Sequence, residues 1–437
     1  MNSNYKPVSA HMLLGFLILL NILNFVDRGL ISSLAPLITA DLDLTDTQIG
    51  LLTGFFFVIF YSFISIFMGT LADRFNRSLL MGGGLFLWSL LTAASGMAGR
   101  FLHLASARIF VGVGEASLTP AGLSMLSDRF PPEKRAFASG LYYAGIPLGH
   151  GLSLVIAGTI GSALGWRNCF YILGGVGMAM SLLLLFVKDP PRGAMESGGS
   201  ATGGKPPQQS FGRIFKELIA SMRQSVALIM VIVGSSIVVF GMGAGAMDQL
   251  WLVRERSYTQ QNAALIFGVM FIIFGTLGNY IGGAAADWCH KRWPGGRLLF
   301  LAWMELAVIP ITLSYRFIPP DTFLFYACYA IGAMATLAMY GPIFACVQDL
   351  VPIRIRSTSV GMLILGHNVL GAAPGPFVAG FLCDAFRDAG WQQPMTYGTF
   401  FTRIVGILAV PMFFVAARRY KADVDRVHAL ESQEPAI

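Results

Sequence analysis

Four charged side chains lie within otherwise apolar segments of this 437-residue chain. Asp27 and Arg28 are neighbours in an apolar run over residues 12–38, and Arg108 and Glu115 lie seven residues apart in another. A charged side chain at the centre of a bilayer costs about 2.5 to 3.5 kcal/mol on insertion scales, so it usually faces a cavity or a partner. Adjacent helical residues point about 100° apart and need different partners, whereas residues seven apart share one helix face. We therefore expect these four side chains to meet as ion pairs between two helices.

These residue types suit anion binding and proton exchange. Arg28 and Arg108 can bind an anionic headgroup through charge-assisted hydrogen bonds. A carboxyl group changes its proton affinity when it gains or loses an arginine partner, so Asp27 and Glu115 are the predicted proton-coupling residues. Glu115 is the main candidate because it shares a helix face with Arg108. The alternative, salt bridges that only lock the helices together, is disfavoured because a buried ion pair seldom stabilises more than apolar packing does.

The composition indicates an integral membrane protein whose helices position these residues. Hydrophobic residues make up 55% of the chain and charged residues 12%, and a spanning helix needs about 20 mostly apolar residues. Runs of that length are too long for barrel strands, so the predicted fold class is an all-α polytopic membrane protein. Twelve runs qualify, at residues 12–38, 47–72, 79–99, 102–127, 135–162, 166–187, 226–252, 260–286, 297–317, 321–348, 357–383 and 396–417.

The basic residues predict the orientation. With both termini in the cytoplasm, 21 of the 30 Lys and Arg residues lie on that side, seven lie outside and two lie within helices. We therefore predict a protein of the cell (inner) membrane with cytoplasmic N- and C-termini. No basic stripe with interleaved aromatic residues suggests nucleic-acid binding. The five scattered cysteines lack metal-type spacing, no nucleophile–base pattern indicates an enzyme, and we expect no metal or cofactor.

The chain also repeats itself. The segment GTLADRFNR (residues 69–77) returns as GAAADWCHK (283–291), and DRFPPEKRAFASG (128–140) returns as DLVPIRIRSTSVG (349–361). The repeat predicts a six-helix bundle at 1–188, a second one at 226–420 and a cytoplasmic tail at 421–437. Residues 189–225, between the bundles, are predicted to form a cytoplasmic linker that ends in an amphipathic surface helix.

Two parallel six-helix halves, with GTLADRFNR after the second helix, resemble the major facilitator superfamily. Within it, NFVDR, RIFVGVGEAS and GHNVLGAAPGPFVAGFLCD, in helices 1, 4 and 11, together resemble the spinster family of lipid and lysolipid transporters. The resemblance implies two pseudo-symmetric bundles around a central cavity lined by helices 1, 4, 7 and 10. It implies a proton-coupled secondary transporter that moves an amphipathic, lipid-like anion by alternating access. Its expected partners are that substrate, protons and membrane lipids, and we expect a monomer.

The resemblance also implies a gate on the cytoplasmic side. Asp73 is expected at the start of helix 11, where the helix dipole favours an anion, and Arg77 is expected to pair with Asp128. Lys291, Asp287 and Asp349 are expected to repeat this arrangement in the second half. The complete set of predicted gating residues is Asp73, Arg77, Asp128, Arg135, Asp287, Lys291, Asp349 and Arg356.

The cavity helices of the second half are apolar and aromatic, which suits a substrate tail. The predicted tail residues are Tyr326, Tyr329, Tyr340 and Phe240; packing between helices is the alternative role for each. Two alternative functions remain: an organic-anion or sugar-acid symporter, in which Arg28 and Arg108 bind a small carboxylate, and a non-transporting membrane receptor on the same fold.

Several further residues have two possible roles. Asp46 is predicted to cap a helix, with an outer proton or cation sensor as the alternative. His150 and His367 are predicted to pack, with a proton relay as the alternative. Glu305 is expected to make an interior hydrogen bond. Gly112 and Gly114 follow no strand, which excludes a phosphate-binding loop, and are expected to permit close helix contact.

Overall fold

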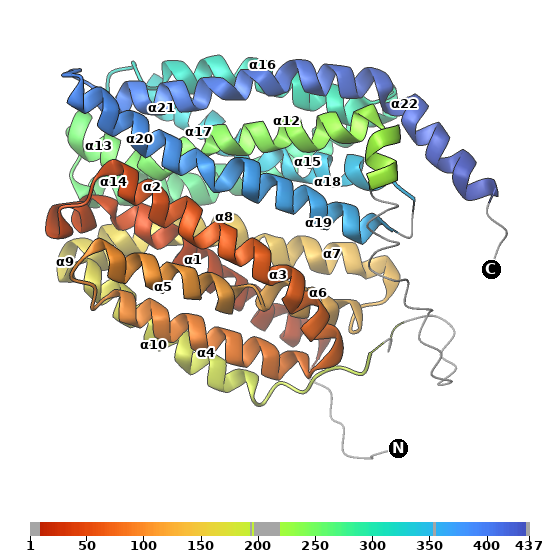
Figure 1. The fold of residues 1–437 in the computed structure, drawn as a ribbon, viewed down its shortest axis with the longest axis horizontal. Coiled ribbons are helices and arrows are strands. Elements are labelled where there is room, and N and C mark those ends of the chain that lie inside the picture. Colours follow the sequence, from red (N-terminus) through yellow and green to blue (C-terminus); the bar gives the residue numbers. More distant parts are fainter. Residues whose placement is uncertain (1–8, 193–194, 196–218, 353–354, 434–437) are drawn as a thin grey trace. The chain divides into compact units, whose positions relative to one another are not determined.

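The computed structural model describes residues 9–192, 195, 219–352 and 355–433, except the side chains of residues 73, 132, 133, 136, 357 and 430–433. Within those residues the regular elements are all helical (Figure 1). Twelve helices are long and apolar enough to cross a membrane. The predicted fold class is therefore confirmed. Most of the predicted surface helix before residue 225 falls outside the described residues.

The chain forms two compact units, one of residues 1–203 with 248–272 and the other of residues 204–247 with 273–437. The helices of the first unit are α1 (Ala10–Leu42), α2 (Asp46–Gly50), α3 (Phe56–Arg74), α4 (Arg77–Ser95), α5 (Phe101–Glu115), α6 (Leu118–Ser127), α7 (Pro132–Tyr143), α8 (Gly145–Ile156), α9 (Ser162–Leu164), α10 (Trp166–Leu184), α13 (Asp248–Glu255) and α14 (Gln260–Met270). Those of the second are α12 (Val226–Met242), α15 (Thr276–Arg292), α16 (Gly296–Ser314), α17 (Phe323–Ala338), α18 (Tyr340–Asp349), α19 (Arg356–Gly366), α20 (Pro374–Asp388), α21 (Pro394–Ile404) and α22 (Ala409–Gln433). The bundle boundaries read from the repeat stay a prediction.

Short polar residues begin several of the spanning helices. The Thr45 hydroxyl accepts a hydrogen bond from the Gln48 amide while the Gln48 side chain binds the Thr45 amide, which forms a capping box. The side chains of Asn76, Ser225, Thr259 and Thr322 also accept a hydrogen bond from a backbone amide of the first turn, and so cap α4, α12, α14 and α17. Each cap satisfies an amide that the helix itself leaves without an acceptor. Thr45, and not Asp46, is thus the cap of the second spanning segment, and the capping prediction for Asp46 is wrong.

The departures from regular α-helix recur at matching places in the two halves. π-helical turns interrupt the second and eighth spanning segments, at Leu51–Phe55 and Phe271–Gly275, and the fifth and eleventh, at Ala157–Gly161 and His367–Ala372. The fourth segment breaks after Glu115, and the tenth breaks at Met339. Such turns widen a helix and are frequent at functional sites. The break in the fourth segment lies directly beside one of the predicted proton-binding acids.

Glycines bring the helices of the first unit into close contact. A Cβ atom at Gly114 would lie 2.7 Å from the Gly84 carbonyl oxygen on α4, and one at Gly112 would lie 2.9 Å from the Phe57 carbonyl oxygen on α3. The expected role of these two glycines is therefore confirmed. On α8, a Cβ atom at Gly149 would lie 2.5 Å from the Phe25 Cβ atom of α1. These contacts hold α5 against α3 and α4, and α1 against α8; α1 and α5 carry the four charged residues.

In the second unit, α12, α16, α18 and α22 surround a core of buried aliphatic and aromatic side chains. The helix α22 continues to Gln433, well beyond the predicted apolar run that ends at 417. In this polar extension Asp423 is buried and accepts hydrogen bonds from the Ser225 hydroxyl at 2.9 Å and the Ala227 amide at 3.0 Å. The last helix thus stabilises the start of α12.

Candidate functional site

The four intramembrane charges form two ion pairs between α1 and α5. Arg108 Nη1 lies 3.3 Å from Asp27 Oδ2, and Arg28 Nε lies 2.8 Å from Glu115 Oε2. Asp27 and Arg28 are adjacent on α1, but their partners, Arg108 and Glu115, lie about two helical turns apart on α5. The meeting of these side chains, expected from their spacing, is confirmed; their roles in transport stay predictions.

The members of this charge cluster differ in exposure. Asp27, Arg108 and Glu115 each expose 1% of their surface, whereas the Arg28 side chain exposes 19%. Asp27 also accepts a hydrogen bond from the Thr92 hydroxyl of α4 at 2.8 Å. The hydrogen bonds from the guanidinium and the hydroxyl offset the free-energy cost of removing this carboxylate from water. Arg28 is therefore the most accessible cation of the cluster.

Three aromatic rings surround Arg28 and one contacts Arg108, a feature that was not predicted from the sequence. The Arg28 Cζ atom lies 4.2 Å from the centre of the Tyr61 ring and 5.0 Å from the centres of the Phe25 and Phe57 rings. The Arg108 Cζ atom lies 4.8 Å from the centre of the Phe57 ring. Cation–π contacts of this kind contribute about 0.5 to 2 kcal/mol each and keep a cation in place away from water. Phe57 and Tyr61 lie four residues apart, so both rings fall on one face of their helix. This spacing was the sequence pattern that could have predicted an aromatic surface for a cation.

The ion pairs leave several buried polar atoms open. Among the described residues, Glu115 Oε1, Arg108 Nε and Nη2 and the Asn24 amide nitrogen have no hydrogen-bond partner. The Nε and Nη2 atoms form one edge of the guanidinium, and such an edge matches two oxygens of a carboxylate or phosphate. Buried polar atoms without partners are costly, so this edge favours a ligand with anionic oxygens.

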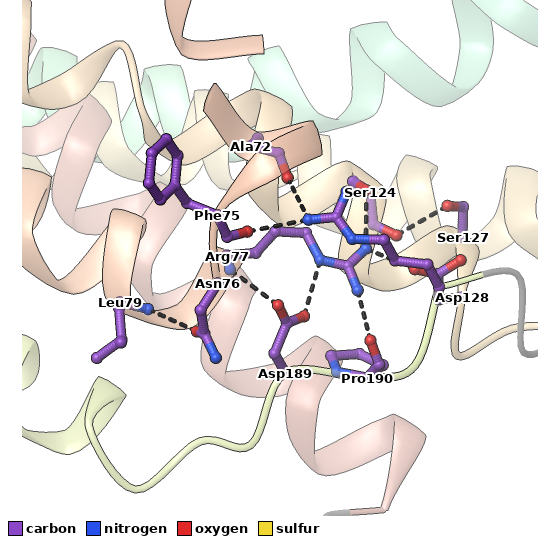
Figure 2. Close-up of polar contacts among 11 residues, drawn as sticks. Ala72, Phe75, Asn76, Arg77, Leu79, Ser124, Ser127, Asp128, Asp189 and Pro190 are labelled. Carbon is purple, nitrogen blue, oxygen red and sulfur yellow. Dashed lines mark hydrogen bonds and ion pairs between the residues drawn. The ribbon is translucent and has the colours of Figure 1, made fainter. Parts of the chain in front are cut away.

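A second buried cluster is centred on Arg77, at the start of α4 (Figure 2). Arg77 is fully buried, and its guanidinium contacts Asp128 Oδ2 at 2.5 Å and Asp189 Oδ1 at 2.8 Å. It also donates to the Ser124 hydroxyl at 2.8 Å and the Pro190 carbonyl at 2.6 Å. The expected Arg77–Asp128 pair is confirmed. The first residues of the predicted linker, Asp189 and Pro190, add contacts that the repeat did not reveal.

Replacement of Arg77 by Ala is expected to destabilise the protein strongly. It would leave two carboxylates of this cluster without their cation, and breaking a buried ion pair from one side costs about 3 to 5 kcal/mol. A thermal unfolding scan of the purified protein in detergent should show a large fall in the midpoint. Arg297→Ala is the matched control, since Arg297 bridges more exposed acids, and surface pairs contribute about 0 to 1 kcal/mol. Equal shifts in the two variants would contradict this assignment.

In the second half, the cation between the two predicted gating acids is Arg297. Its guanidinium lies 2.9 Å from Asp287 Oδ1 and 3.1 Å from Asp349 Oδ2, and the Tyr420 hydroxyl donates to Asp349 at 2.6 Å. The sequence repeat aligned Lys291 with Arg77, but Lys291 is exposed and lies within α15. The connection to α16 is longer here, so Arg297 takes the place at the helix start that Arg77 has on α4. The expectation for Lys291 is corrected accordingly.

The other gating residues make local contacts. Arg135 Nε donates to the Phe130 carbonyl at 3.3 Å, and Arg356 Nε donates to the Gln348 carbonyl at 3.0 Å. The side chain of Asp73 lies outside the described residues. A gating role for this set therefore stays a prediction.

The predicted tail residues are spread along the second unit. Tyr326 lies near the start of α17, where its hydroxyl donates to Asp321 at 2.8 Å, and Tyr329 contacts the Tyr315 ring. Tyr340 begins α18 and contacts the His367 ring, and Phe240 lies on α12. At 1.5 Å per residue, Tyr326 and Tyr340 are separated by about 21 Å along the helix axis. They do not form one compact cluster.

The residues with two possible roles also make identifiable contacts. Asp46 is fully buried and pairs with Arg254 of α13 at 2.8 Å. His150 packs between the rings of Phe25 and Phe271, and His367 shares a hydrogen bond of 2.8 Å with the Ser235 hydroxyl. For His150 this is the packing environment that was expected.

Comparison with known proteins decides the family. The model of the Major Facilitator Superfamily matches residues 17–376. The chain belongs to the major facilitator superfamily. It is 29% identical to an MFS-type efflux pump of Mycolicibacterium smegmatis, over 96% of this chain and 95% of that protein. It is 26% identical to the sphingosine-1-phosphate transporter SPNS2 of Xenopus tropicalis, over 98% of this chain and 85% of that protein.

The fold comparison points to the same relatives. A bacterial homologue of the human lysosomal transporter spinster, crystallised in an inward-facing, unoccupied conformation, matches with a TM-score of 0.83. It is 25% identical, and the match covers 96% of this chain and 99% of that one. The resemblance to the spinster family, read from helices 1, 4 and 11, is thereby confirmed. The chain is an integral membrane protein of a transporter superfamily related to the spinster transporters.

Proposed function

We propose that this superfamily member is a proton-coupled secondary transporter of an amphipathic, lipid-like anion of the lysolipid or sphingoid-phosphate type. The observation that carries the proposal is the charge cluster of α1 and α5. Two arginines are paired with two acids, one arginine is partly exposed, and the other keeps an open guanidinium edge. A purely structural pair would leave no such edge, because an unsatisfied buried donor lowers stability.

The headgroup binds in competition with the acids. Arg28, held among three rings and partly exposed, meets the anionic oxygens first. The Arg108 edge formed by Nε and Nη2 then offers two parallel hydrogen bonds, the geometry in which arginine binds phosphate or carboxylate. Each bond that the headgroup forms weakens the hold of the same arginine on Glu115 or Asp27.

This competition supplies proton coupling. While Arg28 holds Glu115, the carboxylate is stabilised in its charged form, and when the headgroup takes the arginine the acid is left buried without a cation. A buried acid in that situation binds a proton. Substrate and proton therefore favour each other's binding, and the coupling free energy is the same in both directions. Asp27, which keeps the Thr92 hydroxyl, is the second titrating group.

The substrate tail is assigned to the aromatic residues of the seventh and tenth spanning segments. The separation of about 21 Å between Tyr326 and Tyr340 along the helix axis suits an extended acyl or sphingoid chain better than a compact ring. The Xenopus relative is a sphingosine-1-phosphate transporter, which supports the same substrate class. The distribution of basic residues supports cytoplasmic termini in the cell membrane.

Transport into proteoliposomes tests this function. Purified protein in liposomes with an imposed pH gradient should move radiolabelled sphingosine-1-phosphate or a lysophospholipid faster than protein-free liposomes do. Succinate and gluconate serve as probes of the organic-anion alternative. Driven flux of the short acids without flux of the lipids would favour that symporter, and binding of the lipids without flux would favour a receptor.

A further inference from the structure

A partly open cavity in the second unit is lined by an acid that the proposed mechanism does not use. The cavity lies among α12, α16, α17 and α21, and its volume is about 50 Å³. About 10 to 15 Å³ of such space holds one water molecule, provided that polar groups line it. The polar lining residues are Glu305, Thr312, Thr336 and Arg403. The cavity is therefore suited to a few water molecules.

Glu305 is the unusual member of this lining. It exposes only 6% of its surface, and no described residue forms a hydrogen bond or an ion pair with its carboxyl group. The interior hydrogen bond expected from the sequence is thus not found among those residues. A carboxylate in such surroundings is strongly unfavourable, so the group must hold a proton or face a solvated cation.

The neighbouring hydroxyls favour a carboxyl group that donates a proton. The Thr312 hydroxyl donates to the Val308 and Ile309 carbonyls at 3.1 Å, and the Thr336 hydroxyl donates to the Gly332 carbonyl at 2.8 Å. Their protons are engaged, but each oxygen can still accept a hydrogen bond, directly or through water. A protonated Glu305 can serve as that donor.

Glu305 shares the cavity lining with one cation, Arg403. Among the described residues that line the cavity, Arg403 of α21 is the other charged residue, and no histidine or further acid is present. The remaining helices packed against α16, which are α15, α18 and α22, contribute no lining residue. Glu305 thus lines a space large enough for water together with one cation and two hydroxyls.

We propose that Glu305 is a second proton-binding site, separate from Asp27 and Glu115, which exchanges its proton with water in this cavity. The carboxyl O–H bond breaks, the proton passes to a cavity water, and the carboxylate that remains shares the solvated cavity with the Arg403 guanidinium. The reverse step restores the neutral acid. This site lies wholly within the second unit, and the proposal holds whatever substrate the protein carries.

Infrared difference spectroscopy of the full-length protein in detergent tests the proposal directly. A carbonyl-stretch band of a protonated buried carboxylic acid should decline as the pH is raised. The band should be absent from Glu305→Gln and retained in Glu115→Gln. A Glu305-dependent band that does not change with pH would show a permanently neutral structural acid and overturn the proposal. The absence of any Glu305-dependent band would show a permanently ionised one, with the same consequence.

A cavity-filling variant provides an independent check that does not remove the acid. A Cβ atom at Gly406 would meet its nearest neighbour, Ile309 Cδ1, at 3.9 Å, an ordinary contact, so Gly406→Ala adds a methyl group to the cavity without a clash. The Glu305 band should remain, but its shift after transfer to deuterated water should become several-fold slower. An unchanged exchange rate would contradict the role of cavity water. Gly283→Ala, with no atom within 4 Å of its added Cβ, is the control.

Discussion

Glu115→Gln should remove transport driven by a pH gradient and Asp27→Asn should weaken it, while both variants retain exchange of substrate across the membrane. Both substitutions keep the size of the side chain and remove its ability to gain and lose a proton. With Gln at 115, Arg28 has no carboxylate to release when the headgroup binds, so substrate and proton no longer influence each other. Uptake into proteoliposomes under an imposed gradient should fall to the level of protein-free liposomes for Glu115→Gln. The Asp27→Asn effect should be smaller but in the same direction.

A carboxylate outside the cluster provides the control for this pair. Asp41 lies on the same helix as Asp27 but forms a surface pair with Arg167, in which its side chain is 43% exposed. Asp41→Asn should retain driven uptake. Gradient-driven transport that survives both Glu115→Gln and Asp27→Asn would refute the assignment of the coupling residues.

Arg28→Ala and Arg108→Ala should weaken binding of a lipid anion by about 1.5 to 3 kcal/mol, which is roughly 10- to 150-fold in Kd. Each substitution removes hydrogen bonds to a charged group. For Arg28 the rings of Phe25, Phe57 and Tyr61 also lose the cation that they surround. Scintillation proximity binding with radiolabelled sphingosine-1-phosphate measures the change. Arg167→Ala, at an exposed arginine, should leave Kd unchanged.

Substitutions in the tail region should have a different signature. Bulky or polar replacements at Tyr329 or Tyr340 should alter the preference for chain length and leave the binding of a short-chain phosphate nearly constant. If the arginine and tyrosine variants lose affinity equally for short carboxylates and long-chain lipids, the division into headgroup and tail regions is wrong. The organic-anion symporter would then be the better interpretation.

The spanning helices and the charge cluster could be predicted because each follows from a pattern of residues that lie close together in the sequence. Apolar runs of membrane length specify helices, and the spacing of Arg108 and Glu115 places both on one face towards Asp27 and Arg28. The ends of helices were less predictable. The apolar pattern of the last span ends near residue 417, yet its helix continues in polar residues, because Asp423 binds the start of α12. Hydropathy marks where a helix leaves the membrane and not where it ends.

The remaining contacts depend on register and packing that one sequence does not reveal. The repeat aligns Arg77 with Lys291, but the connection before α16 is longer than the one before α4. The residue that takes the place of Arg77 is therefore Arg297, which the repeat did not reveal. Thr92 carried no signal, since a lone threonine in an apolar helix usually bonds its own backbone. Asp189 was hidden in a segment rich in Gly, Pro and Ser, where its contact with Arg77 could not be seen. Each of these partners comes from a helix or loop distant in sequence.

Proton uptake on substrate binding is the measurement that tests the central claim most directly. Sphingosine-1-phosphate is added to purified protein in weakly buffered detergent, and a pH indicator reports the protons bound or released. The account predicts that the unmodified protein takes up more protons on binding than Glu115→Gln does, since the displaced acid is the group that binds them. Equal proton uptake by the two proteins, with both binding the lipid, would contradict competition between headgroup and acid for the same arginine.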